Sequence, residues 1–258
     1  MNILVCYKLV PDARDIEVKA DGTIFLGKAE WNIGQYDLNA VEAGVSLAEE
    51  TGGKTIALSI GSSQLINSKA RKDILSRGPE ELYLVIDDCL EGADTNLTAR
   101  TIAAVVKKLS DVDLVICGEG SSDLYFQQVG LQVGELLDWS TTNSVTKIEI
   151  GDRGLVIERT LEQDVEILDV PLPAVLSVTT DINQPRLPSM KEILRAGKKP
   201  VTEWSVSDLT VEGDLENQVE VLSINAPPTV DRKQIMISGS SEEMVGQLIS
   251  YLSKEGVL

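Results

Sequence analysis

Short apolar runs alternate with helical patterns along the chain as far as Asp138. The runs are continuously apolar, which is typical of strands buried on both faces of a parallel sheet. Between them, apolar residues recur every three or four positions, and this spacing predicts helices. The predicted strands are residues 2–7, 55–60, 82–86 and 112–117, and the predicted helices are residues 36–50, 69–77, 94–108 and 127–137.

The pattern changes after Asp138. Residues 144–150 and 155–161 flank a GDRG turn and predict an antiparallel hairpin. Residues 165–168 and 174–178 add further strand. We therefore expect an α/β fold with a parallel, Rossmann-like core and this hairpin at one edge of a mixed sheet.

The C-terminal part of the chain loses this alternation. Residues 201–228 are mostly polar with short β-like runs such as 219–224, and residues 242–252 predict a final amphipathic helix. A tail that is half extended and half helical cannot build its own core, so we expect it to pack on the main domain or on another chain. The sequence thus predicts a main domain over residues 1–199 and an arm over residues 200–258.

Composition narrows the chemistry. The chain has 258 residues and no histidine, which excludes Ser-His and Cys-His nucleophile schemes and removes the commonest metal ligand. A net charge of −18 predicts repulsion from nucleic acids and anionic membranes. No apolar run predicts a membrane span, and no basic region precedes an apolar stretch at the N-terminus. Three widely spaced cysteines favour neither disulfides nor a zinc cluster, so the expected compartment is cytoplasmic.

The strongest candidate for ligand binding is CGEGSSD at residues 117–123, between a predicted strand and a predicted helix. Ligands of open α/β sheets bind at the carboxyl ends of the strands. Glycines let the backbone approach a phosphate, and the first amides of the next helix attract an anion. The alternative is an ordinary loop in which Ser122 or Asp123 caps the helix. The stretch is neither a P-loop nor GxGxxG, so it carries no nucleotide fingerprint by itself.

Three further stretches are candidates, and the one that follows the first strand falls at the same predicted edge. GADT at residues 92–95 opens a helix and either contacts a ribose or phosphate or caps that helix. NIGQYD at residues 32–37 precedes another helix and is either a binding loop or a capping loop. Residues 6–12, with Cys6 and Lys8, follow the first strand, and they are either part of the site or a core cysteine followed by a plain turn.

A basic segment stands out on this acidic chain at residues 183–200. Two prolines hold an extended lead, and we expect Ser189 to cap a short helix that ends at Gly197. The apolar side chains of this helix predict a docking surface, and the alternative is a surface helix with solvated basic residues. The candidate partner-binding residues are Leu187, Met190, Ile193, Leu194 and Arg195.

Taken in this order, these stretches resemble the β subunit of electron-transfer flavoproteins. The similarity covers nearly the whole chain. It is carried by VCYKLVPD at residues 5–12, YDLNAVE at 36–42, the block 113–130, LPAV at 172–175, and NQPR at 183–186 through KK at 198–199. LSRGP at residues 75–79 and SSDLY at 121–125 are similar to the branch that serves carnitine-type and other acyl-CoA pathways.

This resemblance implies a fold of the adenine-nucleotide α-hydrolase type, without hydrolysis, and a heterodimer with a larger α subunit. The α subunit would hold one FAD and exchange electrons with an acyl-CoA-type dehydrogenase, and the β subunit would hold a second nucleotide. Segment 183–199 would be a recognition loop with Leu187 as its anchor, and the arm would wrap onto the α subunit. Carried over by position, the nucleotide-binding residues are Cys6, Gly34, Gln35, Tyr36, Asp37, Ile60, Gly118, Glu119, Gly120, Ser121, Ser122, Asp123, Leu124, Tyr125, Phe126, Gln127, Gln128 and Val129.

The resemblance leaves the second nucleotide open, because it is AMP in simple carriers and FAD in electron-bifurcating members. The pattern at Asp94, Thr95 and Thr98 is similar to bifurcating members, which favours FAD and adds NADH and ferredoxin as partners. Glu119 disfavours FAD, because bifurcating members usually carry a basic residue at this position and a carboxylate disfavours a pyrophosphate. Gly120 would remove this objection if it turned Glu119 away.

Two other functions compete with this expectation. A stress-type nucleotide-binding homodimer would share the broad fold, but it would need neither segment 183–199 nor the arm. An ATP-pyrophosphatase-like adenylating enzyme would carry a Ser-Gly-Gly-x-Asp-Ser loop after its first strand. This chain has KLVPD there, at residues 8–12, which argues against such an enzyme.

Overall fold

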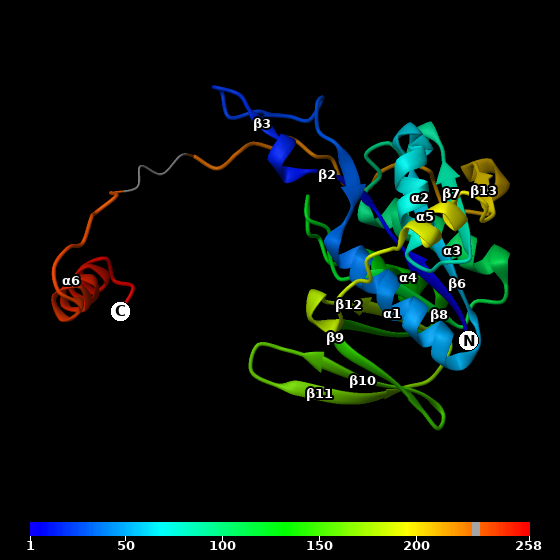
Figure 1. Cartoon of the computed structure of the whole chain (residues 1–258). Helices are drawn as coiled ribbons and strands as arrows, with labels where there is room; N and C mark the ends of the chain where they lie inside the picture. The colour runs from blue at the N-terminus through cyan, green and yellow to red at the C-terminus, as the bar shows by residue number, and fades with distance from the viewer. Residues whose placement is uncertain (229–232) are drawn as a thin grey trace. The chain divides into compact units, whose positions relative to one another are not determined.

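A nine-stranded mixed sheet forms the centre of the fold, in the order β11-β10-β9-β12-β8-β1-β6-β7-β13 (Figure 1). This computed structural model describes residues 1–228 and 233–258. Along the sheet, every pair of neighbouring strands between β9 and β13 is parallel. The β9-β10-β11 end is antiparallel. The expected parallel core with an edge hairpin is thus confirmed. The strands are β1 (Asn2–Cys6), β6 (Lys54–Gly61), β7 (Glu81–Ile86), β8 (Leu114–Gly118), β9 (Ser140–Gly151), β10 (Gly154–Thr160), β11 (Val165–Val170), β12 (Ala174–Val178) and β13 (Val201–Trp204).

Four helices follow the parallel strands, and each begins and ends within two residues of its predicted range. Ser189 caps a further short helix through a capping box with Glu192, and Gly197 follows its last residue, as expected. The helices are α1 (Gln35–Thr51), α2 (Ser68–Ser76), α3 (Thr95–Leu109), α4 (Val129–Leu137), α5 (Met190–Ala196) and α6 (Ser241–Lys254).

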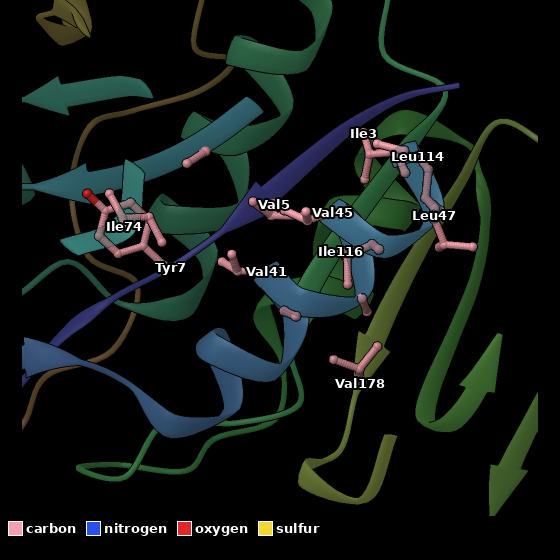
Figure 2. Close-up of a cluster of buried hydrophobic side chains, with 14 of the residues drawn as sticks. Ile3, Val5, Tyr7, Val41, Val45, Leu47, Ile74, Leu114, Ile116 and Val178 are labelled. Carbon is pink, nitrogen blue, oxygen red and sulfur yellow. The ribbon is translucent and has the colours of Figure 1, made fainter. Parts of the chain in front are cut away.

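Helices cover both faces of the sheet, because successive side chains of each buried strand point to opposite faces. Figure 2 shows Val41 and Val45 of α1 beside Val5 of β1 and Ile116 of β8, within one buried cluster. Leu4 of β1 belongs to a second cluster, which includes side chains of α3 and α4. Fully burying such a side chain contributes about 1.5–3 kcal/mol relative to leaving it exposed, so both layers hold the central strands in place.

The chain changes its direction across the sheet at β1. From β1 it proceeds through β6 and β7, and it then returns to place β8 on the other side of β1. The connections that leave β1 and β8 therefore diverge. The carboxyl ends of these two strands form a topological switch point, which is where open α/β sheets bind their ligands.

Some short strands have no apolar run that predicts them. β2 (Leu9–Pro11) pairs with β5 (Trp31–Ile33), and β3 (Glu17–Val18) pairs with β4 (Ile24–Phe25). The expectation of β structure at residues 219–224 is wrong. The backbone amides of Gln218 and Val219 bond to the carboxylate of Asp94 instead of to a neighbouring strand.

Contacts divide the described chain into two compact units. One comprises Met1–Glu17 with Phe25–Ser223, and the other comprises Val18–Ile24 with Ile224–Leu258. The first contains the nine-stranded sheet and continues past residue 199, because β13 pairs with β7. The second contains α6, none of whose residues is buried. None of the helices in the described ranges is long and apolar enough to cross a membrane.

Candidate functional site

Asp37 joins three elements at the switch point. Its carboxylate accepts the backbone amide of Lys8, just after β1, at 2.8 Å, and it also accepts the backbone amide of Gly118 at the end of β8. The side chain lies in the first turn of α1 and is only 7% exposed. Burial raises the pKa of the Asp37 carboxyl to about 7, although these hydrogen bonds and the charge of Lys8 oppose the shift. Asp37 therefore fixes the start of α1 against both strands.

Two glycines permit this close approach. A Cβ at Gly118 would lie 2.5 Å from one carboxylate oxygen of Asp37, and a Cβ at Gly34 would lie 2.9 Å from the other. Gly34 is also the N-cap of α1, and its carbonyl accepts the amide of Leu38 at 3.0 Å. Gly34 therefore caps α1, as the capping interpretation of residues 32–37 expects, but the carboxylate of Asp37 bonds to Lys8 and Gly118 and not to the start of α1. The same loop stands at the switch point beside β8.

The loop between β8 and α4 is held by hydrogen bonds to neighbouring strands and by one within the loop. The amide of Glu119 donates to the carbonyl of Val178 in β12 at 2.9 Å. The carboxylate of Glu119 accepts hydrogen bonds from Gln127 at 2.8 Å and from Ser144 of β9 at 3.3 Å. The carboxylate of Glu119, whose role the sequence leaves open, is therefore engaged by Gln127 of the loop and Ser144 of β9.

The end of the same loop leaves α4 without a side-chain cap. Gln128 is the N-cap residue, and it makes no capping hydrogen bond with its side chain. Ser122 and Asp123 lie several residues earlier, so the alternative in which one of them caps this helix is wrong. The first amides of an uncapped helix carry partial positive charge and are suited to an anion. The donor set at this position is therefore compatible with a phosphate.

Two tyrosines connect the loop to the start of α1. The rings of Tyr36 and Tyr125 have their centroids 5.4 Å apart, and their hydroxyl oxygens are 3.3 Å apart. The ring of Tyr125 also covers Gly120, where a Cβ would collide with it. The hydrogen bond with Tyr36, together with burial, raises the pKa of Tyr125 to about 12. The neighbouring Leu124 and Phe126 are exposed, so the loop presents apolar surface at this edge.

Asp94 and Thr95 have different environments. Asp94 is the N-cap of α3 and accepts the amide of Leu97 at 2.8 Å, which confirms the capping interpretation. Its other carboxylate oxygen accepts the amides of Gln218 and Val219 at 2.5 and 3.2 Å. The hydroxyl of Thr95 donates to the side chain of Gln128 at 2.9 Å, so the start of α3 meets the end of the β8–α4 loop. Thr98 lies in the same first turn, where its amide donates to the carbonyl of Asp94 at 3.1 Å.

Cys6 and Ile60 lie at the ends of their strands. Cys6 is buried, and a hydrogen bond with Cys117 of β8, together with burial, raises the pKa of its thiol. Ile60 is half-buried and lies two positions beyond the β6 partner of Cys6. The structure therefore brings the predicted stretches of β1, α1, β6, β8 and α3 to one edge of the sheet.

Residues 183–199, which we call the docking segment, are fixed at both ends. The side-chain amide of Asn39 in α1 donates to the backbone carbonyl of Asn183 at 2.8 Å, and that of Asn183 donates to the carbonyl of Asn39 at 3.0 Å. Arg186 forms ion pairs with Glu42 and Glu49 of the same helix, both at 2.8 Å. At the other end, the ammonium of Lys199 donates to three backbone carbonyls just after or within the last turn of α2, those of Leu75, Gly78 and Pro79.

The middle of the docking segment is exposed. Leu187, Met190 and Leu194 are 88%, 73% and 72% exposed, and Ile193 and Arg195 are exposed as well. All five predicted partner-binding residues therefore lie at the surface of α5 or just before it. Large apolar side chains at this level of exposure, on a segment held by ion pairs, favour a binding surface over a solvated helix.

Several contacts at this edge escape sequence reasoning. Lys8 forms an ion pair with Asp123 at 2.6 Å, and its only signal is its place directly after the first strand. Asn39 lies inside a helical pattern that does not reveal its role with Asn183. Ser144 has no signal at all, because it reaches Glu119 through an irregularity in the pairing of β9 with β12.

Among the described residues, no group of three or more cysteine, aspartate or glutamate side chains is arranged to hold a metal ion. A family model for the electron transfer flavoprotein domain matches residues 23–209, which is more than half of the chain. The matched range includes the loop before α1, the start of α3 and the loop between β8 and α4. On this match and this arrangement of the sheet, the chain belongs to the electron transfer flavoprotein domain family.

Proposed function

We propose that this chain is the β subunit of a heterodimeric electron-transfer flavoprotein. It holds a nucleotide at the switch point, and with the FAD of a larger α subunit it carries electrons between an acyl-CoA-type dehydrogenase and other redox partners. The flavin supplies the redox chemistry. This chain supplies the binding edge and the docking surface.

The observation that carries the proposal is the convergence of two separate stretches on Asp37. The loop Gly34–Asp37 and the loop that begins at Gly118 are bound to each other through this one buried carboxylate. The uncapped start of α4 then adds backbone donors suited to a phosphate. A nucleotide with its adenine near the ends of β1 and β8 and its phosphates near α4 would use all of these features.

Whether the nucleotide is FAD or AMP depends on two neighbouring groups. Thr95 bonds to Gln128 at the end of the loop, which supports a ligand long enough to continue from the loop toward α3, as FAD would. Asp94 supports AMP instead, because its carboxylate already accepts three backbone amides. Glu119 does not decide between them, because Gln127 and Ser144 engage its carboxylate. We keep FAD as the proposal, with NADH and ferredoxin as further partners, and AMP as the alternative.

Nucleotide analysis of the complex tests this proposal. The chain would be co-expressed with its larger subunit, the complex purified, and FAD and AMP released and quantified per heterodimer. Two FAD and no AMP support a bifurcating protein, whereas one FAD and one AMP support a simple carrier. A chain that purifies as a homodimer without flavin would contradict the proposal and favour the stress-type alternative.

The docking segment permits an independent test. Leu187→Ala removes the most exposed apolar side chain of the segment, and truncating an anchor residue of an interface costs about 2 kcal/mol or more. We expect electron transfer with the acyl-CoA-type dehydrogenase to fall about tenfold or more, with unchanged nucleotide content. Ile167→Ala is the matched control, because Ile167 is an exposed apolar residue on β11 at one edge of the sheet. Equal rates for both variants would remove the docking role.

A further inference from the structure

The binding edge is electrostatically unfavourable for a phosphate. The chain has a net charge of −18, and the loop between β8 and α4 carries Glu119 and Asp123. The start of α4 offers a partial positive charge of only about half a unit, which does not offset two carboxylates. A phosphate that binds at this loop therefore needs a cation from another element.

Lys8 is the cation that reaches the loop. Its Nζ lies 2.6 Å from Oδ2 of Asp123. Among the ion pairs of residues 1–228 and 233–258, this one alone involves a residue of the loop between β8 and α4. Lys8 follows β1, so the positive charge reaches the loop from a different element of the switch point.

The backbone of Lys8 is fixed, while its side chain remains accessible. Its amide donates to Asp37 at 2.8 Å, and its carbonyl accepts the amide of Gly34 at 3.1 Å. The side chain is 47% exposed and that of Asp123 is 22% exposed. An ammonium carries three hydrogen-bond donors, and Asp123 occupies one of them. Within the described ranges the other two have no partner, so they are available to a ligand at this edge.

We propose that Lys8 is a phosphate-binding residue of the nucleotide site and that Asp123 orients its ammonium toward the phosphate. The proposal rests on the function given above and adds a residue to it. Asp123 is suited to this positioning role because it is itself held, with its carboxylate accepting the amide of Leu124 at 2.9 Å and a hydrogen bond from Ser121. Lys8 then bridges the loop carboxylate and the phosphate, which offsets the repulsion between them.

Comparing AMP with adenosine tests the proposal, because the two ligands differ only in the phosphate. The full-length chain, purified with its larger subunit and freed of nucleotide, would be titrated with each ligand by calorimetry. For Lys8→Met we expect AMP affinity to fall about 10- to 100-fold, as for a lost hydrogen bond between charged groups. Adenosine affinity should stay within about twofold, and Lys8→Arg should retain most of the AMP affinity.

Lys147→Met is the matched control, because it removes one positive charge whose ion pairs are with Glu149 and Glu158, neither of which belongs to the loop. It should leave both affinities unchanged. Lys8→Gln carries the same expectation as Lys8→Met and replaces it if thermal denaturation shows that the first variant does not fold. AMP binding unchanged in the Lys8 variants, or lost equally with adenosine binding, would overturn the phosphate role alone. A wild-type protein that binds AMP no better than adenosine would overturn the proposed nucleotide site as well.

Discussion

Asp37 is a buried carboxylate whose ionisation opposes folding. Burial raises its pKa in the folded protein to about 7, from an unfolded value near 4. Between these values the folded state binds a proton that the unfolded state does not, so the free energy of unfolding decreases as the pH rises. This decrease in the free energy of unfolding begins near the pKa of the unfolded state and is complete above the pKa of the folded state. It is on the order of 4 kcal/mol in total.

This behaviour can be measured between pH 5 and 7. The chain has no histidine, so Asp37 should dominate the pH dependence in this range. We expect the free energy of unfolding of the nucleotide-free chain, measured with urea, to decrease by on the order of 2 kcal/mol from pH 5 to pH 7.

Asp37→Asn is the control for that measurement, because it cannot ionise. Its pH dependence should be nearly flat, and its stability at pH 5 should be lower by about 1–3 kcal/mol because one backbone amide loses its acceptor. A wild-type protein that is equally stable at pH 5 and pH 7 would contradict the assignment.

Gly118 belongs to the same contact. In Gly118→Ala the added Cβ would lie 2.5 Å from Asp37 and 2.8 Å from the Cβ of Tyr36, so the start of α1 must shift. We expect the variant to lose about 1–3 kcal/mol of stability in urea denaturation and to bind nucleotide more weakly. Gly197→Ala is the control, since its nearest neighbouring atom would lie 3.8 Å away. Similar losses in the two variants would show that the contact at Asp37 is not what requires the glycine.

At the scale of elements, α1 connects the binding edge with the docking segment. Its first turn carries Tyr36 and Asp37 at the switch point, and its next turns carry Asn39 and Glu42, which hold the docking segment. The proposed nucleotide site and the docking segment therefore both contact one helix, which packs against β1 and β8.

Arg186 tests how this attachment orders α5. Its guanidinium binds both Glu42 and Glu49, so Arg186→Ala removes the attachment and leaves two carboxylates near each other on α1. We expect faster hydrogen exchange of the α5 amides, with a change of about 1 kcal/mol or less in global stability because the pairs are partly exposed. Lys28→Ala, which breaks an exposed ion pair with Glu17, should leave exchange in α5 unchanged. Unaltered exchange in Arg186→Ala would contradict the attachment.

Much of the element pattern follows from local sequence, and the exceptions have a physical cause. The helix at 36–50 and the strand at 82–86 are predicted within a residue at each end, because apolar side chains cover one full face of the helix and both faces of the strand. β13 is not predicted, because its four residues lack an apolar run and become a strand only by pairing with β7. Residues 219–224 show the opposite error: their side chains are typical of a strand, but they form none because they pair with no neighbouring strand.

The site is predictable only in part for the same reason. The loop at Gly118 can be expected at the carboxyl edge of the sheet, since glycines and a predicted helix follow that strand. Gly34 precedes a predicted helix, but the strand before it, β5, pairs with β2 outside the main sheet, so its place at this edge cannot be expected in the same way. The partners of Glu119 and Asp94 cannot be foreseen, because Ser144 and Gln218 come from distant segments whose positions depend on the whole fold. The tertiary structure, and not the local sequence, therefore determines which carboxylates are available to a ligand.

At the scale of the whole molecule, the second compact unit contributes little to the core. α6 buries none of its residues, and Met244, Val245, Leu248 and Ile249 are exposed along it. A chain that ends at Ser223 should therefore unfold at nearly the same temperature as the full chain, as measured by circular dichroism. It should no longer co-purify with the larger subunit if the arm makes the intersubunit contact. A melting temperature lower by more than about 4 °C, which corresponds to a loss of about 1 kcal/mol or more in a domain of this size, would show that the arm stabilises the main domain.

The attachment of the docking segment at Asn183, Arg186 and Lys199 has a kinetic consequence for the proposed carrier. A segment that is already ordered loses little conformational entropy when a partner binds, so association needs no folding step. The association rate constant should then fall in the range of about 10⁵–10⁷ M⁻¹ s⁻¹ that orientation alone allows. For the proposed carrier, a contact limited to the few exposed apolar side chains around Leu187 should have a short residence time. The segment that makes docking fast would then also let the protein leave one redox partner for the next.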